Sequence, residues 1–192
     1  MAQSFLQRLD PEALCFSFRT FSDTPYTRQS GCDPLERAIY GSLDRCWQEL
    51  VQLNRAGAAV AVTINQTNAQ GRMIEDIQRV RALFLDDDRG IDAGDFGLRP
   101  HLRVTTSNGH HHYYWLVNDV ALAQFAFCQR RLAARYGGDS RVTALNQAMQ
   151  LPGFWRRKRA AQPRLPSLTV YGIDIPYKSQ QLRALLGSNA SL

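Results

Sequence analysis

The chain has 192 residues, a formal net charge of +6, 44% hydrophobic and 21% charged residues, which is an ordinary composition for a globular protein. No apolar run approaches the ~20 residues of a membrane-crossing helix, no secretory signal opens the chain, and the four scattered cysteines predict a reducing cytoplasm rather than a disulfide framework or zinc knuckle. The excess of basic over acidic residues favours a polyanionic partner such as nucleic acid or nucleotides.

In the first half of the chain, partial alternation of apolar residues predicts a strand over residues 13–21, followed by a polar loop over 22–34. Apolar residues at helical spacing predict a helix over 35–54, with Gly57 as a plausible stop. The short β-branched run at 58–65 predicts a buried strand.

In the second half, Asn108-Gly109 stands between two strand-like runs and predicts a hairpin, because both residues tolerate positive φ. The predicted elements are, in order, a strand over 81–87, hairpin strands over 101–107 and 110–117, helices over 119–136 and 142–150, and a last strand over 167–173. This mixed order predicts an α+β fold with helices on one face of a sheet.

The stretch R-A-L-F-L-D-D-D-R-G, residues 81–90, carries an apolar strand directly into three aspartates. Side chains alternate along a strand, so Asp86 and Asp88 are expected on one face. Two close carboxylates repel unless a cation lies between them, and hard oxygen ligands suit Mg²⁺ or Mn²⁺. The alternative is a solvated turn, since Asp and Gly are turn residues.

Three consecutive histidines follow the hairpin turn, and alternation puts His110, His112 and Tyr114 on one face. A two-residue turn would set Thr105 opposite His112 and Arg103 opposite Tyr114. Arg103, Thr105 and His112 would then hold a phosphate. The alternative is a set of exposed strand residues beside a turn.

Two further features stand after the predicted hairpin. Asp139 follows Gly137-Gly138 and is either a third carboxylate or the N-cap of the next helix. The run L-P-G-F-W-R-R-K-R, residues 151–159, places aromatics beside cations, which suits stacking on bases and contact with phosphates. Its alternative is a solvated basic loop that Phe154 and Trp155 anchor to the core.

Several ordered motifs resemble one family. They are G-A-A-V-A-V-T-I-N-Q-T-N-A-Q-G-R, R-V-R-A-L-F-L-D-D-D, T-T-S-N-G-H-H-H-Y-Y-W-L-V, Y-G-G-D and L-P-G-F-W-R-R-K. Together they resemble a RepB-type primase domain, the plasmid and phage branch of the archaeo-eukaryotic primase (primase–polymerase) superfamily. The resemblance covers about residues 16–177.

The resemblance implies one catalytic domain over residues 1–192, with an N-terminal α/β unit (about 13–75) joined to an RRM-like antiparallel catalytic sheet (about 76–177). It implies a catalytic acidic pair at Asp86 and Asp88 and a third metal-binding carboxylate at Asp139. The family motif S-x-x-x-x-H maps onto Ser107 and His112, with the histidine touching the phosphates of the incoming nucleotide.

The implied activity is template-directed nucleotidyl transfer that makes short primers on single-stranded DNA, in plasmid or phage replication in a bacterial cytoplasm. Two Mg²⁺ or Mn²⁺ ions are expected at the three carboxylates, and NTP or dNTP is the expected substrate. A replicative helicase is a further candidate partner, and no membrane is involved. The expected nucleotide-binding residues are Arg103, Thr105, Ser107, His112 and Lys158, and the expected template-binding residues are Trp155, Arg156, Arg157 and Lys158.

The sequence departs from the family pattern before the L-P-G turn, where Gln147 and Gln150 stand at positions usually occupied by arginine. Loss of two cations there bears on nucleotide affinity. Asp87 is also an alternative to Asp88 as the second acid.

Two other functions are compatible with the residues. An HUH-type replication nuclease or relaxase binds one metal through a histidine pair and attacks DNA with a tyrosine, for which Tyr136 is the candidate. The middle of the three histidines is not apolar, which fits that pattern poorly. The other alternative is an inactive RRM-like module that binds single-stranded nucleic acid.

Overall fold

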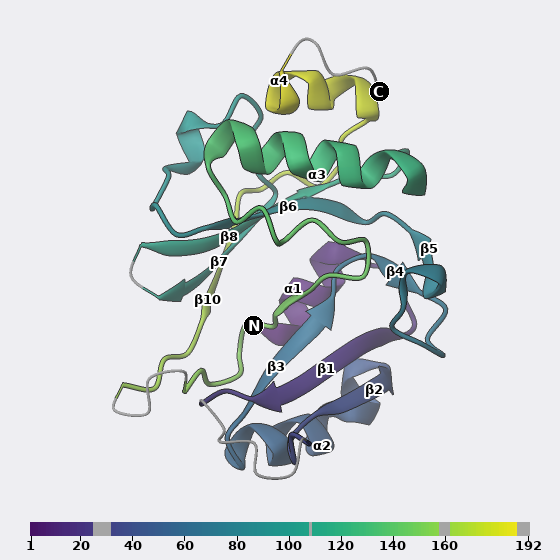
Figure 1. Cartoon of the computed structure of the whole chain (residues 1–192), viewed down its shortest axis with the longest axis vertical. Helices are drawn as coiled ribbons and strands as arrows, with labels where there is room; N and C mark the ends of the chain where they lie inside the picture. The colour runs from purple at the N-terminus through teal and green to yellow at the C-terminus, as the bar shows by residue number, and fades with distance from the viewer. Residues whose placement is uncertain (25–31, 108, 158–161, 188–192) are drawn as a thin grey trace.

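The computed structural model describes residues 1–24, 32–107, 109–157 and 162–187. Residues 25–31 of the predicted loop, Asn108 of the predicted turn and Lys158 lie outside the described residues. Within them the strands form two four-stranded antiparallel sheets and one two-stranded ribbon (Figure 1). The mixture of helices and antiparallel sheets confirms the predicted α+β class.

The N-terminal sheet has the strand order β2-β1-β3-β9. Its strands are β1 (Phe16–Ser22), β2 (Arg37–Gly41), β3 (Ala58–Thr63) and β9 (Ala148–Gln150). Helix α2 (Leu43–Arg55) covers one face of this sheet (Figure 1). Because β9 comes from the second half of the chain, the N-terminal sheet is completed by a segment that lies far away in sequence.

The second sheet has the order β10-β7-β8-β6. Its strands are β6 (Ala82–Asp87), β7 (Leu102–Ser107), β8 (His110–Leu116) and β10 (Ser167–Val170). Helices α3 (Leu122–Tyr136) and α4 (Leu182–Leu186) lie together on one side of it (Figure 1). The remaining elements are α1 (Ala2–Leu9), β4 (Gln66–Thr67), β5 (Ile77–Arg79) and three 3₁₀ turns, Ile74–Asp76, Ala93–Asp95 and Ser179–Gln181.

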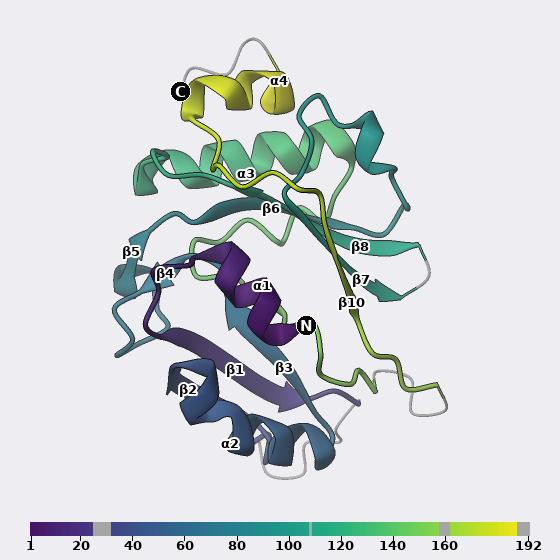
Figure 2. The ribbon, with the colours of Figure 1, turned by 180° about the vertical axis from the view of Figure 1, so that it is seen from behind.

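The core is richest in aromatic residues around β8, where Tyr113, Tyr114 and Trp115 have no exposed surface. Their alternation serves both faces of the second sheet. The Trp115 ring lies 5.0 Å from Phe96 on one side, and the Tyr114 ring lies 5.2 Å from Phe5 of α1 on the other. Figure 2 shows α1 at the junction of the two sheets, so this helix joins them by burying its apolar face.

Two predicted helices are wrong in part or in whole. Residues 37–41 of the predicted helix 35–54 form β2, which pairs with β1, and the helix begins only after Ser42, whose hydroxyl accepts from the Arg45 amide at 3.3 Å. The predicted helix 142–150 is absent, since residues 148–150 pair with β3. In both cases strand pairing with a distant segment overrides helical spacing.

No described helix is long and apolar enough to cross a membrane.

A buried ion pair fixes the end of α1 against the start of β6. The Asp10 carboxylate accepts from Arg81 Nε at 2.6 Å and from Arg79 Nη2 at 2.7 Å. The Arg81 side chain is 3% exposed, whereas that of Arg79 is 43% exposed. Burial lowers the pKa of the Arg81 guanidinium, and its bond to Asp10 opposes that effect.

We predict that Asp10→Ala lowers the free energy of unfolding by about 3–5 kcal/mol, because it leaves the buried Arg81 charge without its partner. Arg79→Ala is the matched control and costs less than about 1 kcal/mol, since its pair with Asp10 is half exposed to solvent. Urea unfolding followed by circular dichroism measures both changes. Equal losses in the two variants would contradict this assignment.

Candidate active site

The first acid of the site is placed by the register of β6 against β8. Asp86 lies directly across from His112, and its Oδ1 is 3.4 Å from His112 Nε2. Both side chains are largely buried, with exposed fractions of 27% for Asp86 and 11% for His112. The histidine and the carboxylate therefore share one face of the second sheet.

Asp88 follows the end of β6 and pairs with the first histidine of β8. Its Oδ1 lies 2.5 Å from His110 Nδ1, and both side chains are exposed. Asp87 serves a different purpose, because its carboxylate is fully buried and accepts from the amides of Arg89 at 2.9 Å and Ile91 at 2.8 Å. Asp87 thus closes the turn after β6, which leaves Asp88 as the accessible neighbour of Asp86.

The third acid arrives from the far end of α3. Gly137 has a φ of 67° and ends that helix, and a side chain at Gly138 would overlap Leu85 and lie 3.1 Å from the Asp86 carbonyl oxygen. The chain therefore passes directly over β6, and the Asp139 amide donates to the Asp86 carbonyl at 3.2 Å. This backbone contact brings the predicted third carboxylate beside the first.

Asp139 is not the N-cap of a following helix; its carboxylate is held by Arg141. Arg141 Nη2 lies 2.8 Å from Asp139 Oδ2, and Arg141 Nε lies within 3.1 Å of both carboxylate oxygens. These bonds lower the pKa of Asp139. The same bonds raise the pKa of Arg141, and the negative charges of Asp86 and Asp88 add to that effect.

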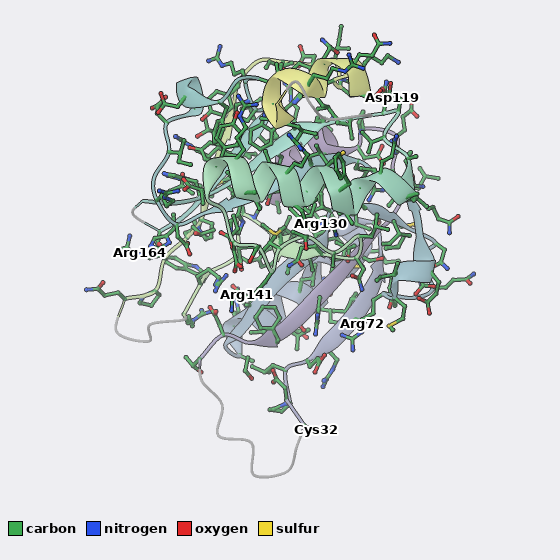
Figure 3. The ribbon with its side chains drawn as sticks, turned by 45° about the horizontal axis from the view of Figure 1, so that its top comes forward. Cys32, Arg72, Asp119, Arg130, Arg141 and Arg164 are labelled. Atoms are coloured by element: carbon green, nitrogen blue, oxygen red, sulfur yellow. The ribbon has the colours of Figure 1, made fainter. Side chains whose placement is uncertain are left out.

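Arg141 is the residue that the sequence analysis missed. Figure 3 shows it on the segment between α3 and the N-terminal sheet. Its side chain is 89% exposed, so the pair with Asp139 is readily exchanged for another partner. The Asp-x-Arg spacing of residues 139 and 141 was the available signal.

The donors at this site suit a hard divalent cation, since all three are carboxylates. In the side-chain arrangement of the described residues, no group of three or more His, Cys, Asp or Glu is set to hold an ion. Asp139 is engaged by Arg141 and Asp88 by His110, and both pairs include an exposed partner.

Two buried polar atoms beside Asp86 lack a hydrogen-bond partner among the described residues. They are Nδ1 of His112 and the hydroxyl of Tyr114. Burial raises the pKa of Tyr114 well above its ordinary value, and the Asp86 charge adds to the effect. Asp86 therefore lies partly buried beside two buried polar side chains, whereas the side chain of Asp88 is exposed to solvent.

The predicted phosphate cluster of Arg103, Thr105 and His112 is not assembled. A bulge between Thr105 and Ser107 shifts the hairpin register by one residue, so Thr105 opposes His111 and Arg103 opposes Tyr113. The bulge therefore turns Arg103 and Thr105 to the face opposite His112.

Both residues have partners on that face. Thr105 Oγ1 lies 3.1 Å from His111 Nδ1, and Arg103 Nη2 lies 3.3 Å from Thr169 Oγ1. Burial, followed by the nearby Arg103 charge, lowers the pKa of His111. Ser107 pairs with His110 at the end of the hairpin, close to Asp88.

The basic aromatic loop is anchored to the N-terminal unit. Asn54 at the end of α2 bonds both the amide and the carbonyl of Trp155, at 3.0 and 2.8 Å. Arg156 Nε donates to the buried Asp23 at 3.0 Å, and Arg157 Nη1 donates to the Asn54 carbonyl at 2.6 Å. The two described arginines therefore have internal partners, and the Trp155 ring remains 46% exposed.

The two glutamines at family arginine positions have structural roles. Gln150 accepts from Arg156 Nη1 at 2.8 Å, and Gln147 Nε2 donates to the Ala148 carbonyl at 3.2 Å. Tyr136, the nucleophile of the alternative nuclease function, accepts through its hydroxyl from the Gly97 amide at 3.0 Å and packs against Phe96. Its hydroxyl thus faces the loop before β7, on the side of the sheet away from Asp86.

Comparison with solved structures shows the same fold in primases. The AEP domain of the cyanophage S-2L primase-polymerase (PrimPol) superposes with a TM-score of 0.70 at 20% identity, covering 95% of each chain. The catalytic domain of primase Repb' in complex with initiator DNA gives 0.63 at 19% identity, covering 96% of this chain and 90% of the other. Primase RepB' gives 0.62 at 20% identity, with 88% and 55% covered.

A search of curated proteins found no match. The family model of the RepB DNA-primase N-terminal domain matches residues 47–168, which include β6, the hairpin and Asp139. This match covers more than half of the chain. The chain therefore belongs to the RepB DNA-primase N-terminal domain family.

Proposed function

We propose that the chain is a DNA primase, a nucleotidyltransferase that makes short primers on single-stranded DNA with two divalent ions held by Asp86, Asp88 and Asp139. The observation that carries this proposal is the backbone hydrogen bond from Asp139 to Asp86, which brings a carboxylate from the end of α3 to the acids of β6. The family match and a structural neighbour described as bound to initiator DNA support it.

Each acid has a defined part in the proposed reaction. Bound at these carboxylates, Mg²⁺ or Mn²⁺ would lower the pKa of an attacking 3′-hydroxyl and neutralise charge on the triphosphate. Asp86 is held against His112 in a partly buried position, so it is the fixed ligand of the set. Asp88 and Asp139 are freed by releasing His110 and Arg141.

The side chains released from these pairs would remain near the site. Arg141 and His110 are both exposed, so each would be able to turn to the triphosphate once its carboxylate binds an ion. His112 presents its ring beside Asp86, where it would donate to a phosphate oxygen. The exposed Trp155 offers a stacking surface to the template.

Geometry disfavours the covalent nuclease, since the Tyr136 hydroxyl is bonded to the Gly97 amide and packed on the far side of the sheet. An inactive nucleic-acid-binding module differs from a primase in one measurable respect. It binds DNA but makes no primers with Mn²⁺ or Mg²⁺, so Asp86→Ala and chelator change nothing that it does.

We predict that Asp86→Ala lowers primer synthesis on single-stranded DNA by at least ~100-fold, the loss expected when a main charge-stabilising group is removed. DNA binding should stay near the wild-type level, because the change removes a negative charge. Gel analysis of labelled products with Mn²⁺ and with Mg²⁺ measures synthesis. Asp95→Ala, an exposed carboxylate in the loop before β7, is the control and should remain active. Undiminished synthesis by Asp86→Ala would refute the metal assignment.

We predict that Arg141→Ala binds Mn²⁺ about two- to fivefold more tightly in the absence of nucleotide, because Arg141 competes with the ion for Asp139. Electron paramagnetic resonance of free Mn²⁺ during titration measures the affinity. Arg130→Ala removes an equal charge from the exposed surface of α3 and should leave the affinity unchanged. Weaker Mn²⁺ binding by Arg141→Ala would contradict the competition.

A further inference from the structure

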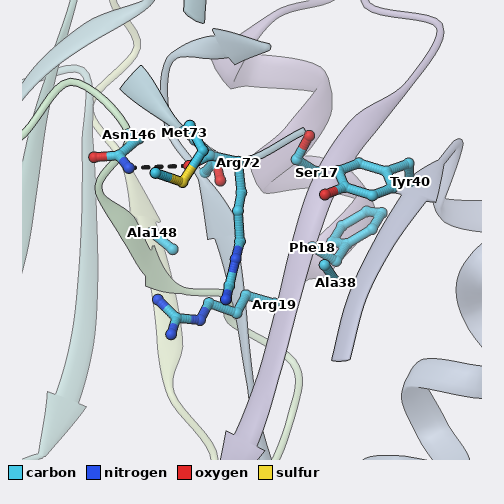
Figure 4. A pocket seen from close by; sticks show the side chains of 10 residues that line it. Ser17, Phe18, Arg19, Ala38, Tyr40, Arg72, Met73, Asn146 and Ala148 are labelled. Atoms are coloured by element: carbon cyan, nitrogen blue, oxygen red, sulfur yellow. Dashed lines mark hydrogen bonds between the residues drawn. The ribbon is translucent and has the colours of Figure 1, made fainter. Parts of the chain in front are cut away.

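A pocket of about 240 Å³ lies on the face of the N-terminal sheet opposite to the one that packs in the core. Its floor includes side chains from β1, β2, β3 and β9, and the strand register pairs Ser17 with Tyr40 and Thr63 with Ala148. Figure 4 shows Tyr40 and Ser17 on one side, Met73 and Asn146 on the other, and Arg72 reaching toward Arg19.

One wall of the pocket is made by Arg72, the last residue of the motif N-Q-T-N-A-Q-G-R (residues 65–72), and by the next residue, Met73. The motif has no part in the acidic site. Asn146 Nδ2 donates to the Arg72 carbonyl at 2.9 Å and so ties this wall to the segment after α3. Ser17 Oγ lies 2.5 Å from Thr67 Oγ1, which ties the floor to the same motif. The pocket is therefore preformed by contacts among three separate segments.

Two arginines line the pocket, and Glu36, which is not part of the lining, pairs with both of them. Arg19 Nη2 and Arg72 Nη1 approach the same oxygen of Glu36, at 3.3 and 3.1 Å, and all three side chains are substantially exposed. With Glu36 counted, this group carries one net positive charge, which matches one phosphodiester and falls well short of a triphosphate with its several negative charges.

The other walls offer contacts for a flat ring. Tyr40 is half buried and presents an aromatic side chain, and Met73 is 57% exposed. A methionine at the mouth adapts to the shape of what it covers. Base stacking on an aromatic side chain is the usual way in which proteins hold unpaired nucleotides without reading their sequence.

The pocket is connected to the acidic site by one stretch of chain. Residues 139–148 begin at the contact between Asp139 and Asp86 and end in β9, after bonds from the Ile64 amide to Gln147 and from Asn65 to Leu145. The segment crosses between the two sheets in Figure 1. Asn146 and Ala148 of this stretch line the pocket, so the same segment borders both places.

We propose that this pocket holds one base of the single-stranded DNA template, stacked between Tyr40 and Met73, with the adjoining phosphate on Arg72 and Arg19. The proposal rests on the proposed primase function, since the DNA strand is its template. The volume supports one base rather than a whole nucleotide triphosphate, because pockets for drug-sized ligands run from about 300 to 1,000 Å³.

The test is equilibrium binding of a fluorescein-labelled oligo(dT) by fluorescence anisotropy at several salt concentrations. Tyr40→Ala should weaken binding about fivefold or more, and Tyr40→Phe should restore it, because stacking needs the ring and not the hydroxyl. Arg72→Gln should weaken binding and lower the slope of log affinity against log salt by about 0.7. Arg130→Gln, which removes an equal charge from α3, should keep the wild-type slope.

The result of this binding experiment does not depend on primase activity, because binding is measured in the Asp86→Ala background, where no synthesis is expected. Wild-type affinity and slope for folded Tyr40→Ala and Arg72→Gln would overturn the proposal while leaving the primase proposal intact. Loss of ATP or dATP binding without loss of oligo(dT) binding would also overturn it, because the pocket would then serve the free nucleotide. Circular dichroism confirms folding, and Met73→Ala provides a second variant at the exposed wall if Tyr40→Ala is unstable.

Discussion

Mutual repulsion of three carboxylates is the constraint around which the site is organised. Asp86, Asp88 and Asp139 come from two separate segments, and like charges brought together raise the free energy of the folded chain unless cations compensate them. Each acid has a close polar partner, namely His112, His110 and Arg141 respectively, of which Arg141 carries a permanent positive charge. The partners are graded from buried to exposed, so the site keeps one fixed acid and two that can exchange partners.

The geometry of the acids depends on backbone features rather than on the acids themselves. Gly138 permits the chain after α3 to cross β6 at a distance that no side chain would tolerate, and Gly137 supplies the left-handed turn that directs it there. Gln129 of α3 completes the contact, because its side chain bonds both the amide and the carbonyl of Phe84 on the edge strand β6. The helix is thus fixed to the strand that carries Asp86.

The sequence correctly predicted the elements whose formation depends on neighbouring residues. The apolar run into the aspartates gives β6, the Asn-Gly pair gives the β7–β8 hairpin, and Gly137 ends α3 as expected. The failures share one cause, which is pairing with a segment distant in sequence. Residues 37–41 and 148–150 carry helical spacing but complete the edges of the N-terminal sheet on either side of β1 and β3.

For the candidate site, the sequence showed which residues carry charge. It did not fully determine which face of the second sheet each side chain occupies. Alternation along a single strand predicts Asp86 and Asp88 on one face, and that prediction requires no knowledge of partners. In the structure they contact His112 and His110 respectively. The positions of Arg103 and Thr105 depended on the cross-strand register. One extra residue at the bulge before Ser107 reversed their face, and nothing in the composition of the hairpin signals it. Arg141 was not predicted, because its role depends on the position of Asp139 in the folded chain.

The buried side-chain amide of Asn65 connects the two sheets. Asn65 has no exposed surface, and its Oδ1 accepts from the Arg81 amide at 3.1 Å at the start of β6. Its Nδ2 donates to the Leu145 carbonyl at 2.9 Å, on the segment that leads back to Asp139. Because an amide left unpaired in the interior is costly, both bonds are maintained together. One side chain thereby holds together the end of β3, the start of β6 and the segment that leads back to Asp139.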